Sequence, residues 1–301
     1  MSSMRTGDAM FELRRLRMLH ELALRGTIAE VAASLSYSPS TVSQQLGILE
    51  REAGVALLEP DGRRVRLTPA GRVLAAHAAR ALELDEGARA ALAGGPSLEP
   101  VRLAAMPTAA ETIVPAALTL LAAREPRLRV ELAALPPEES LFELAARRFD
   151  LVIAEQYPGH TRERREGVTH ELLGEDPIRI VLPPSEPPAP LRALHDRVWV
   201  MEPAGTAARQ WAMQQCRAAG FEPDVRFEAA DLTAHVRLVE SGHAVGMLPD
   251  LIWGDAPPST TVADLPGHPV REVFTAVRDA ARSGEGIRLV RDALAEAFLS
   301  R

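Results

Sequence analysis

TIAEVAASLSYSPSTVSQQLGILER, residues 27–51, encodes two short amphipathic helices joined by a tight turn. Thr27 and Glu30 match a capping box, in which the threonine oxygen accepts from a backbone amide and the glutamate reaches back to the cap. Ser38 is placed to cap the second helix, and Pro39 takes its first position, where the missing N–H leaves no hydrogen bond unmade. The pattern predicts a helix-turn-helix motif.

The second helix is expected to run to about Arg51, and its solvent face carries hydroxyl and carboxamide groups instead of long charged side chains. Glutamine can pair with adenine through two hydrogen bonds, and serine and threonine reach bases or phosphates. A polar face without a partner is the alternative, but the preceding helix and turn favour DNA recognition over about residues 28–47. The candidate contacts on this helix are Ser38, Ser40, Thr41, Ser43, Gln44 and Gln45.

A β-hairpin is predicted directly after this motif, in GVALLEPDGRRVRLT, residues 54–68. Apolar residues alternate along its second strand, and an Asp-Gly pair supplies the tight turn. Beside a helix-turn-helix such a hairpin is a wing, and its tip would carry Arg63 and Arg64 to the minor groove or to phosphates. With a leading helix over 11–25, the winged DNA-binding domain is expected to span residues 11–68.

Composition excludes several classes of protein. Hydrophobic residues make up 47% of the 301 residues and charged residues 25%, which is typical of a globular chain. All 34 basic residues are arginine, so chemistry that needs a P-loop lysine or a Schiff-base lysine is excluded. The single cysteine, Cys216, excludes an internal disulfide and a CxxC metal or redox site, and we expect it to be buried.

The charge is unevenly distributed along the chain. The net charge is −7, yet residues 1–67 hold nine arginines against eight acidic residues, whereas residues 68–301 hold 25 arginines against 33 acidic residues. A chain that is mostly acidic but has one local group of arginines near its start suggests a DNA contact confined to the amino-terminal end. The first twenty residues lack the apolar core of a signal peptide, and no apolar run could span a membrane, so we expect a cytoplasmic protein without a membrane partner.

A long alanine-rich helix is expected next, over residues 69–93, with a stripe of small residues suited to close contact between helices. Such a helix between domains has little core of its own, so it is expected to pair two subunits, although it could instead lie on its own domain. GGPSLEP, residues 94–100, is a hinge by composition.

Strands and helices alternate over the rest of the chain. VRLAAM, LRVELAAL and DLVIAE are strands with helices between them, which implies parallel strands covered by helices. A second round of the same kind follows, so the fold class is α/β with two Rossmann-like lobes. The expected effector-binding domain spans 101–301, with lobe I over about 101–178 and 268–301 and lobe II over about 179–267.

Several motifs together resemble the LysR-type transcriptional regulators. They are ELRRLRMLHELALRGTIAEVAASLSYSPSTVSQQLGILEREAGVALLE, GRRVRLTPAG, and DLVIA, EDPIRIVLP and SGHAVGMLP in the lobes, and the resemblance covers residues 11–301. The chain departs from the family pattern at Pro60, where many members have arginine, and at Ile28, where many have phenylalanine. Its lobes are expected to be similar to those of periplasmic binding proteins.

The resemblance implies a bacterial, sequence-specific DNA-binding transcriptional regulator that works as a homodimer or homotetramer. Paired recognition helices would enter successive major grooves of double-stranded DNA, which requires an inverted-repeat promoter site. A small-molecule effector bound between the lobes would modulate DNA binding or bending. RNA polymerase is a further expected partner, and no cofactor or metal is expected.

The effector is expected at helix starts and at the carboxyl ends of strands, where free amides and the helix dipole favour an anion. Thr108, Thr206 and Asp231 could also be simple helix caps. Glu155 is unusual for an anion pocket and favours a ligand with an amino group, unless it points to solvent. The candidate effector residues are Pro107, Thr108, Ala154, Glu155, Thr206, Asp231 and Met247.

Three other functions compete with this hypothesis. An enzyme has little support, because the spacing of His160 and His170 fits no metal motif and neither GxSxG nor GxGxxG occurs. A bilobed small-molecule sensor would suit the lobes but not the winged domain. A protein-binding adaptor would use the lobes without a ligand. A DNA-binding assay and a ligand thermal shift discriminate among them.

Overall fold

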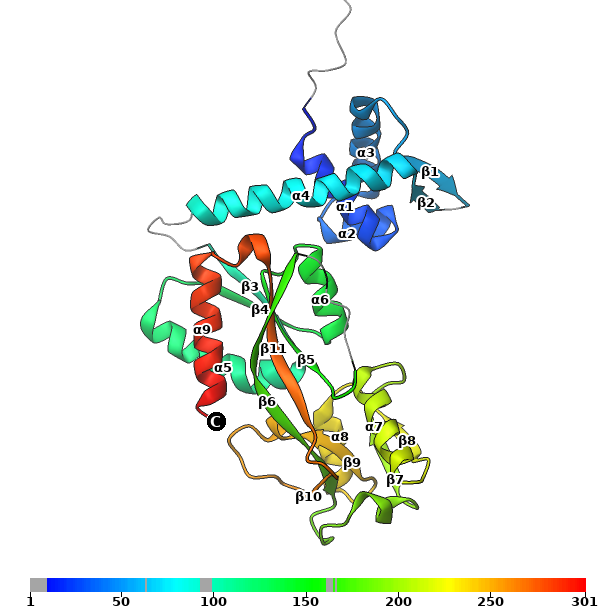
Figure 1. Ribbon diagram of the computed structural model, residues 1–301, viewed down its shortest axis with the longest axis vertical. Coiled ribbons are helices and arrows are strands. Elements are labelled where there is room, and N and C mark those ends of the chain that lie inside the picture. The colour runs from blue at the N-terminus through cyan, green and yellow to red at the C-terminus, as the bar shows by residue number, and fades with distance from the viewer. Residues whose placement is uncertain (1–9, 63, 93–98, 161–164, 166) are drawn as a thin grey trace, which may run out of the picture. The chain divides into compact units, whose positions relative to one another are not determined.

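The computed structural model describes residues 10–62, 64–92, 99–160, 165 and 167–301 (Figure 1). The chain divides into two compact units, Met1–Gly94 and Gly95–Arg301. Arg63 and positions 94–98 of the predicted hinge lie outside the described residues. Within the described residues, no helix combines the length and the apolar character needed to cross a membrane.

The first unit is a winged helix-turn-helix, as the sequence predicted. Leucine, valine and alanine side chains from all of its helices and from the hairpin form one buried core. Its elements are α1 (Leu13–Arg25), α2 (Ile28–Ser34), α3 (Pro39–Ala53), β1 (Leu58–Asp61), β2 (Arg64–Leu67) and α4 (Pro69–Leu92).

Local hydrogen bonds fix where these elements begin and end. The Thr27 hydroxyl accepts from the Glu30 amide, and the Ser38 hydroxyl accepts from the Thr41 amide, as predicted. The Glu30 carboxylate accepts from the Thr27 hydroxyl at 2.8 Å, in place of the predicted bond to the cap amide. Helix α3 runs two residues beyond the predicted end at Arg51. At its far end, the Glu50 carboxylate accepts from the amides of Leu57 and Leu58, which ties the wing to the recognition helix.

A mixed sheet organises the second unit, in the order β10-β6-β11-β5-β3-β4, with β9 paired to β6. A separate parallel pair, β7 with β8, lies farther along the unit. The strands are β3 (Val101–Ala105), β4 (Val130–Ala134), β5 (Leu151–Gln156), β6 (Val168–Leu182), β7 (Val198–Met201), β8 (Asp224–Glu228), β9 (Gly246–Pro249), β10 (Thr261–Asp264) and β11 (Val270–Arg278).

The topology departs from two sequence expectations. Strands β3, β4 and β5 are parallel as predicted, but β11 runs antiparallel to both β5 and β6, so the sheet is mixed. Residues 261–264, for which the sequence analysis named no strand, form β10 and pair with the end of β6. A short strand is stabilised by its neighbour more than by its own sequence.

Among the residues described, five α-helices cover this unit. Helices α5 and α9 pack with the lobe I strands around one apolar core, and α7 and α8 belong to the cores of lobe II. They are α5 (Pro107–Arg124), α6 (Pro137–Ala145), α7 (Ala207–Ala218), α8 (Leu232–Glu240) and α9 (Glu285–Leu299). In Figure 1, β6 and β11 run side by side along this unit, and β6 continues past the start of β11 to pair with β9 and β10.

Candidate functional site

The solvent face of α3 carries the short polar side chains that the sequence pointed to. Ser40, Ser43 and Gln44 are exposed, and Thr41 is half-buried. The Ser38 hydroxyl lies 2.8 Å from the hydroxyls of both Ser40 and Thr41, so these three groups form one connected cluster at the start of the helix. These side chains are uncharged, and the hydroxyl-bearing ones are short, so they would allow a duplex to approach the start of the helix closely.

Gln45 differs from Gln44 in its surroundings. Arg15 on α1 donates from Nη1 to the Gln45 side-chain oxygen at 3.3 Å, and the same arginine pairs with Glu52 at 2.7 Å. A two-bond pairing with adenine uses both the oxygen and the nitrogen of a glutamine amide. The contact with Arg15 would therefore have to break first, which makes Gln44 the better placed candidate.

The turn before α3 adds a residue that the sequence analysis did not single out. Tyr37 is exposed, and the guanidinium of Arg14 lies 4.7 Å from the centre of its ring. Tyr37 could have been noticed in the sequence, because it is an aromatic residue between the serines of the turn. On the wing, Arg64 is exposed and forms no ion pair among the described residues, whereas Arg66 pairs with Glu59 at 3.1 Å.

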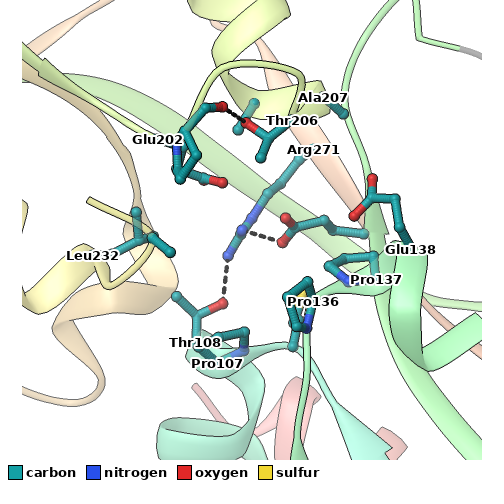
Figure 2. Close-up of a pocket in the computed structure, with 15 residues that line it drawn as sticks. Pro107, Thr108, Pro136, Pro137, Glu138, Glu202, Thr206, Ala207, Leu232 and Arg271 are labelled. Atoms are coloured by element: carbon teal, nitrogen blue, oxygen red, sulfur yellow. Dashed lines mark hydrogen bonds and ion pairs between the residues drawn. The ribbon is translucent and has the colours of Figure 1, made fainter. Parts of the chain in front are cut away.

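A cavity of about 200 Å³ opens between the two lobes of the second unit. Pockets for drug-sized ligands measure roughly 300–1,000 Å³, so this one suits a smaller molecule. Its polar wall residues come from both lobes: Thr108, Glu138, Glu155 and Arg271 from lobe I, and Glu202 and Thr206 from lobe II. In the view of Figure 2, Arg271 lies in the middle, with Glu202 on one side and Glu138 on the other.

Arg271 is the centre of a buried network. Its Nε donates to Asp176 at 2.8 Å, its Nη2 donates to the Thr108 hydroxyl at 2.9 Å, and its Nη1 pairs with Glu155. Asp176 also accepts from the Leu251 amide at 3.0 Å. Arg271 on β11 lies directly opposite Asp176 on β6 in the register of the two strands. Both residues are buried, with 1% of Arg271 and 2% of Asp176 exposed to solvent. A buried ion pair with all its hydrogen bonds made is strongly disrupted when one partner is removed.

The carboxylates around this arginine have unusual acidities. Burial, followed by repulsion from Glu155, raises the pKa of Glu202 to about 8, while Arg271 opposes the shift. Burial also raises the pKa of Asp176, although Arg271 acts in the opposite direction. Perturbed groups in a cleft mark candidate functional sites. Within the described residues, no group of three or more histidine, cysteine or acidic side chains could hold a metal ion.

Comparison with known proteins decides the family. Residues 13–72 match the family model described as "Bacterial regulatory helix-turn-helix protein, lysR family", and residues 94–299 match the model "LysR substrate binding domain". The chain belongs to the LysR family. It is therefore a transcriptional regulator with a helix-turn-helix DNA-binding domain and an effector-binding domain, in a family whose members form oligomers.

Individual LysR-type relatives span most of the chain. The transcriptional dual regulator GltC of Bacillus subtilis is 27% identical over 83% of this chain and 85% of its own length. A protein of Mycobacterium avium, named as a probable hydrogen peroxide-inducible genes activator, is 31% identical over 78% of this chain and 76% of its own length. A full-length OxyR variant from Pseudomonas aeruginosa shares the fold, with a TM-score of 0.69 at 23% identity over 95% of both chains.

The structure brings together four of the seven candidate effector residues of this LysR-type regulator. Pro107, Thr108, Glu155 and Thr206 all line the cavity. The other three lie elsewhere. Ala154 is buried in a neighbouring core cluster, Asp231 caps α8, and Met247 lines a second, smaller cavity together with Tyr157 and His235.

The sequence analysis missed the arginine and two of the acids at the cavity. Arg271 could not be paired with Glu155 from sequence, because the antiparallel course of β11 was not foreseen. Glu202 could have been predicted from the sequence. It directly follows β7, just as Glu155 lies near the end of β5. Reading the two lobes as equivalent would have placed both carboxylates at the carboxyl ends of strands, where ligands bind in open α/β sheets.

Proposed function

We propose that this LysR-type regulator binds an inverted-repeat promoter site through the exposed face of α3 and the wing, as a homodimer or homotetramer, and that a small molecule in the lobe cavity changes its DNA binding or bending. Three connected hydroxyls, Gln44 and Arg64 supply the DNA-facing groups. Two such faces held by one dimer would meet successive major grooves about one helical turn apart.

The observation that carries the effector proposal is that both lobes build the wall of one cavity. A ligand that touches Thr108 and Arg271 on lobe I and Glu202 on lobe II would bind most tightly when the lobes are at one particular angle. A ligand shifts a conformational equilibrium only through such a difference in affinity between states. The cavity therefore has the property that an effector site needs.

Direct sensing of peroxide by a thiol is not supported, although one relative is named for peroxide induction. Cys216 is fully buried in the core of lobe II, and burial raises the pKa of its thiol to about 12. The thiolate is the reactive form of cysteine, so this thiol is shielded twice, by exclusion from solvent and by protonation. A chain with one cysteine also cannot form an internal disulfide.

The proposed role is regulatory and not enzymatic, and it is exerted in the cytoplasm, with RNA polymerase as a further partner at the promoter. The test begins with selection of DNA fragments from the source genome by the purified chain at low ionic strength. A selected fragment is then titrated by fluorescence anisotropy with and without a small-molecule library. Binding to no fragment would refute the DNA part. A bound fragment whose affinity and bend respond to no small molecule would refute the effector part.

A further inference from the structure

We infer that the effector is a small organic cation whose protonated amine lies between Glu202 and Glu138 and next to Glu155. The inference rests on the proposed role of the cavity as the effector site. It concerns the chemical class of the ligand, which neither the family nor the relatives specify.

The arginine in the cavity has no charge to offer an anion. All three nitrogens of the Arg271 guanidinium are engaged, with Asp176, Thr108 and Glu155. The charge of Arg271 is already balanced by Glu155 and Asp176, and only 1% of the residue is exposed, so a carboxylate ligand would have to compete with these two buried partners for it. Breaking a buried ion pair in this way is strongly unfavourable.

Carboxylates outnumber cations at the wall. Three carboxylates, Glu138, Glu155 and Glu202, line the cavity beside one arginine. Glu138 and Glu155 have partners of their own, so Glu202 is the carboxylate that a ligand cation would pair with. The half-buried Glu202 carboxylate receives no hydrogen bond from any residue that the structure describes. Burial, followed by the charge of Glu155, raises its pKa to about 8. A ligand ammonium would supply the missing partner.

Helix starts are the observation that opposes this inference, because the N-terminal end of a helix carries roughly half a positive charge. Helices α5, α6, α7 and α8 all begin at the wall. Three of these starts already have a side chain that serves them: Glu138 in the first turn of α6, Thr206 as the cap of α7, and Asp231 as the cap of α8. Helix α5 begins with Pro107, which has no N–H, so its start offers an anion one amide fewer than an ordinary helix start.

The other residues of the cavity wall indicate the size of the ligand and the polarity of its remaining atoms. Four prolines line the cavity, and none of them can donate a backbone hydrogen bond. The Thr206 hydroxyl is already used, since it donates to the Pro203 carbonyl and accepts from the Arg209 amide. Leu232 and several alanines complete an apolar surface. The site therefore suits an amine with a short hydrocarbon body.

Binding of a cation should release a proton at neutral pH. The charged or titratable groups around Glu202 are Glu138, Glu155, Tyr157, Arg209, His235 and Arg271. An ammonium beside Glu202 would lower the pKa of that carboxyl, so the fraction that is protonated before binding must ionise. The release is a signature that a purely apolar ligand would not give.

The test is isothermal titration calorimetry on the full chain, with butylamine and putrescine as cationic probes and butyrate and succinate as anionic probes of similar length. We expect the amines to bind and the carboxylates not to bind. In buffers of different ionisation enthalpy near pH 7, amine binding should release a fraction of a proton. Glu202→Gln should abolish this release and weaken amine binding about tenfold to a hundredfold, the range for a hydrogen bond between charged groups.

Glu222→Gln is the matched control, because Glu222 is an exposed acid on the same lobe that pairs with Arg217 away from the cavity. It should leave amine binding unchanged. Preferential binding of the carboxylates, absence of amine binding, or amine binding that Glu202→Gln does not weaken would each overturn the inference.

Fluorescence anisotropy on a selected DNA fragment separates this inference from the proposed effector function. A carboxylate that changes DNA binding from within the cavity would support the effector function and refute the cation. An amine that binds by calorimetry without changing DNA affinity or bending would support the cation and refute the effector function.

Discussion

Arg271 on β11 donates from Nη2 to the hydroxyl of Thr108, the second residue of α5, at 2.9 Å and across 163 positions of sequence. The same guanidinium holds Asp176, its register partner on β6. One side chain thus connects a helix start at the cavity wall to the strand that continues into the other lobe. A ligand at this wall would therefore touch a side chain that is bonded directly to strand β6.

Thr108→Val keeps the shape of the side chain and removes the acceptor for Arg271. We expect a loss of roughly 1–3 kcal/mol in the free energy of unfolding, because a buried donor is left without a partner. The effector response should be impaired and DNA affinity nearly unchanged. Urea denaturation and anisotropy measure these effects. Thr119→Val, an exposed site on the same helix, is the control. Loss of DNA binding in Thr108→Val would indicate a general structural role instead.

Glu202 should make the stability of the effector domain depend on pH. Its pKa is about 8 in the folded chain, above the ordinary value of 4.5, so the protonated form is favoured by folding. This contribution is complete below about pH 4.5 and is lost as the pH rises towards 8. The melting temperature should therefore fall less between about pH 5 and pH 8 in Glu202→Gln than in the parent chain. Identical pH profiles of the two proteins would show that Glu202 titrates normally.

Gln44→Ala should weaken binding to the specific DNA site by about 1–3 kcal/mol, the discrimination provided by a two-bond contact with adenine. Helix α3 should remain intact, since the side chain is exposed and contributes nothing to the core. Anisotropy against the selected site and a scrambled one measures the change, with circular dichroism as the check on folding. Gln214→Ala, an exposed glutamine on α7, provides the comparison. Equal affinity of the parent and Gln44→Ala would refute the placement of this face.

Arg64→Ala should lower affinity for all DNA sequences and reduce the slope of affinity against salt by about one, as expected for a lost phosphate contact. The measurement is a salt titration on specific and nonspecific fragments. Arg226→Ala removes an exposed arginine that pairs with Asp224 in the other unit and should leave the slope alone. A slope that is unchanged by Arg64→Ala would remove the wing from the interface.

Cys216 should be inert in the folded chain. Its buried, protonated thiol is expected to react with iodoacetamide only after unfolding in urea. Hydrogen peroxide should leave DNA affinity unchanged in both the parent chain and Cys216→Ala. A peroxide response that disappears in Cys216→Ala would show that this thiol is a sensor after all.

The winged domain was predictable because its signals are local. Caps at Thr27 and Ser38, and Pro39 at the start of a helix, act within a few residues of one another. Apolar periodicity predicted the helices of both units for the same reason. The strand β10 and the antiparallel course of β11 depend on partners far away in sequence, so no local pattern could specify them.

The candidate site was only partly predictable from sequence. Thr108 and Thr206 stand at helix starts, which local patterns identify, and both line the cavity. Arg271 is the second residue of an ordinary strand pattern, and its role follows only from the register that sets it opposite Asp176. The order of the strands in the sheet decides which strand ends meet at the cavity wall, and no single segment of sequence contains that information.

Strand β6 pairs with β11 along its first part and with β9 and β10 near its end, so one continuous strand passes from lobe I to lobe II. A ligand that draws the lobes together must therefore twist the paired strands β6 and β11 instead of bending a flexible linker. Twisting a hydrogen-bonded ribbon stores elastic energy that grows with the angle. That energy limits how far the lobes can rotate and returns them to their resting angle once the ligand has left.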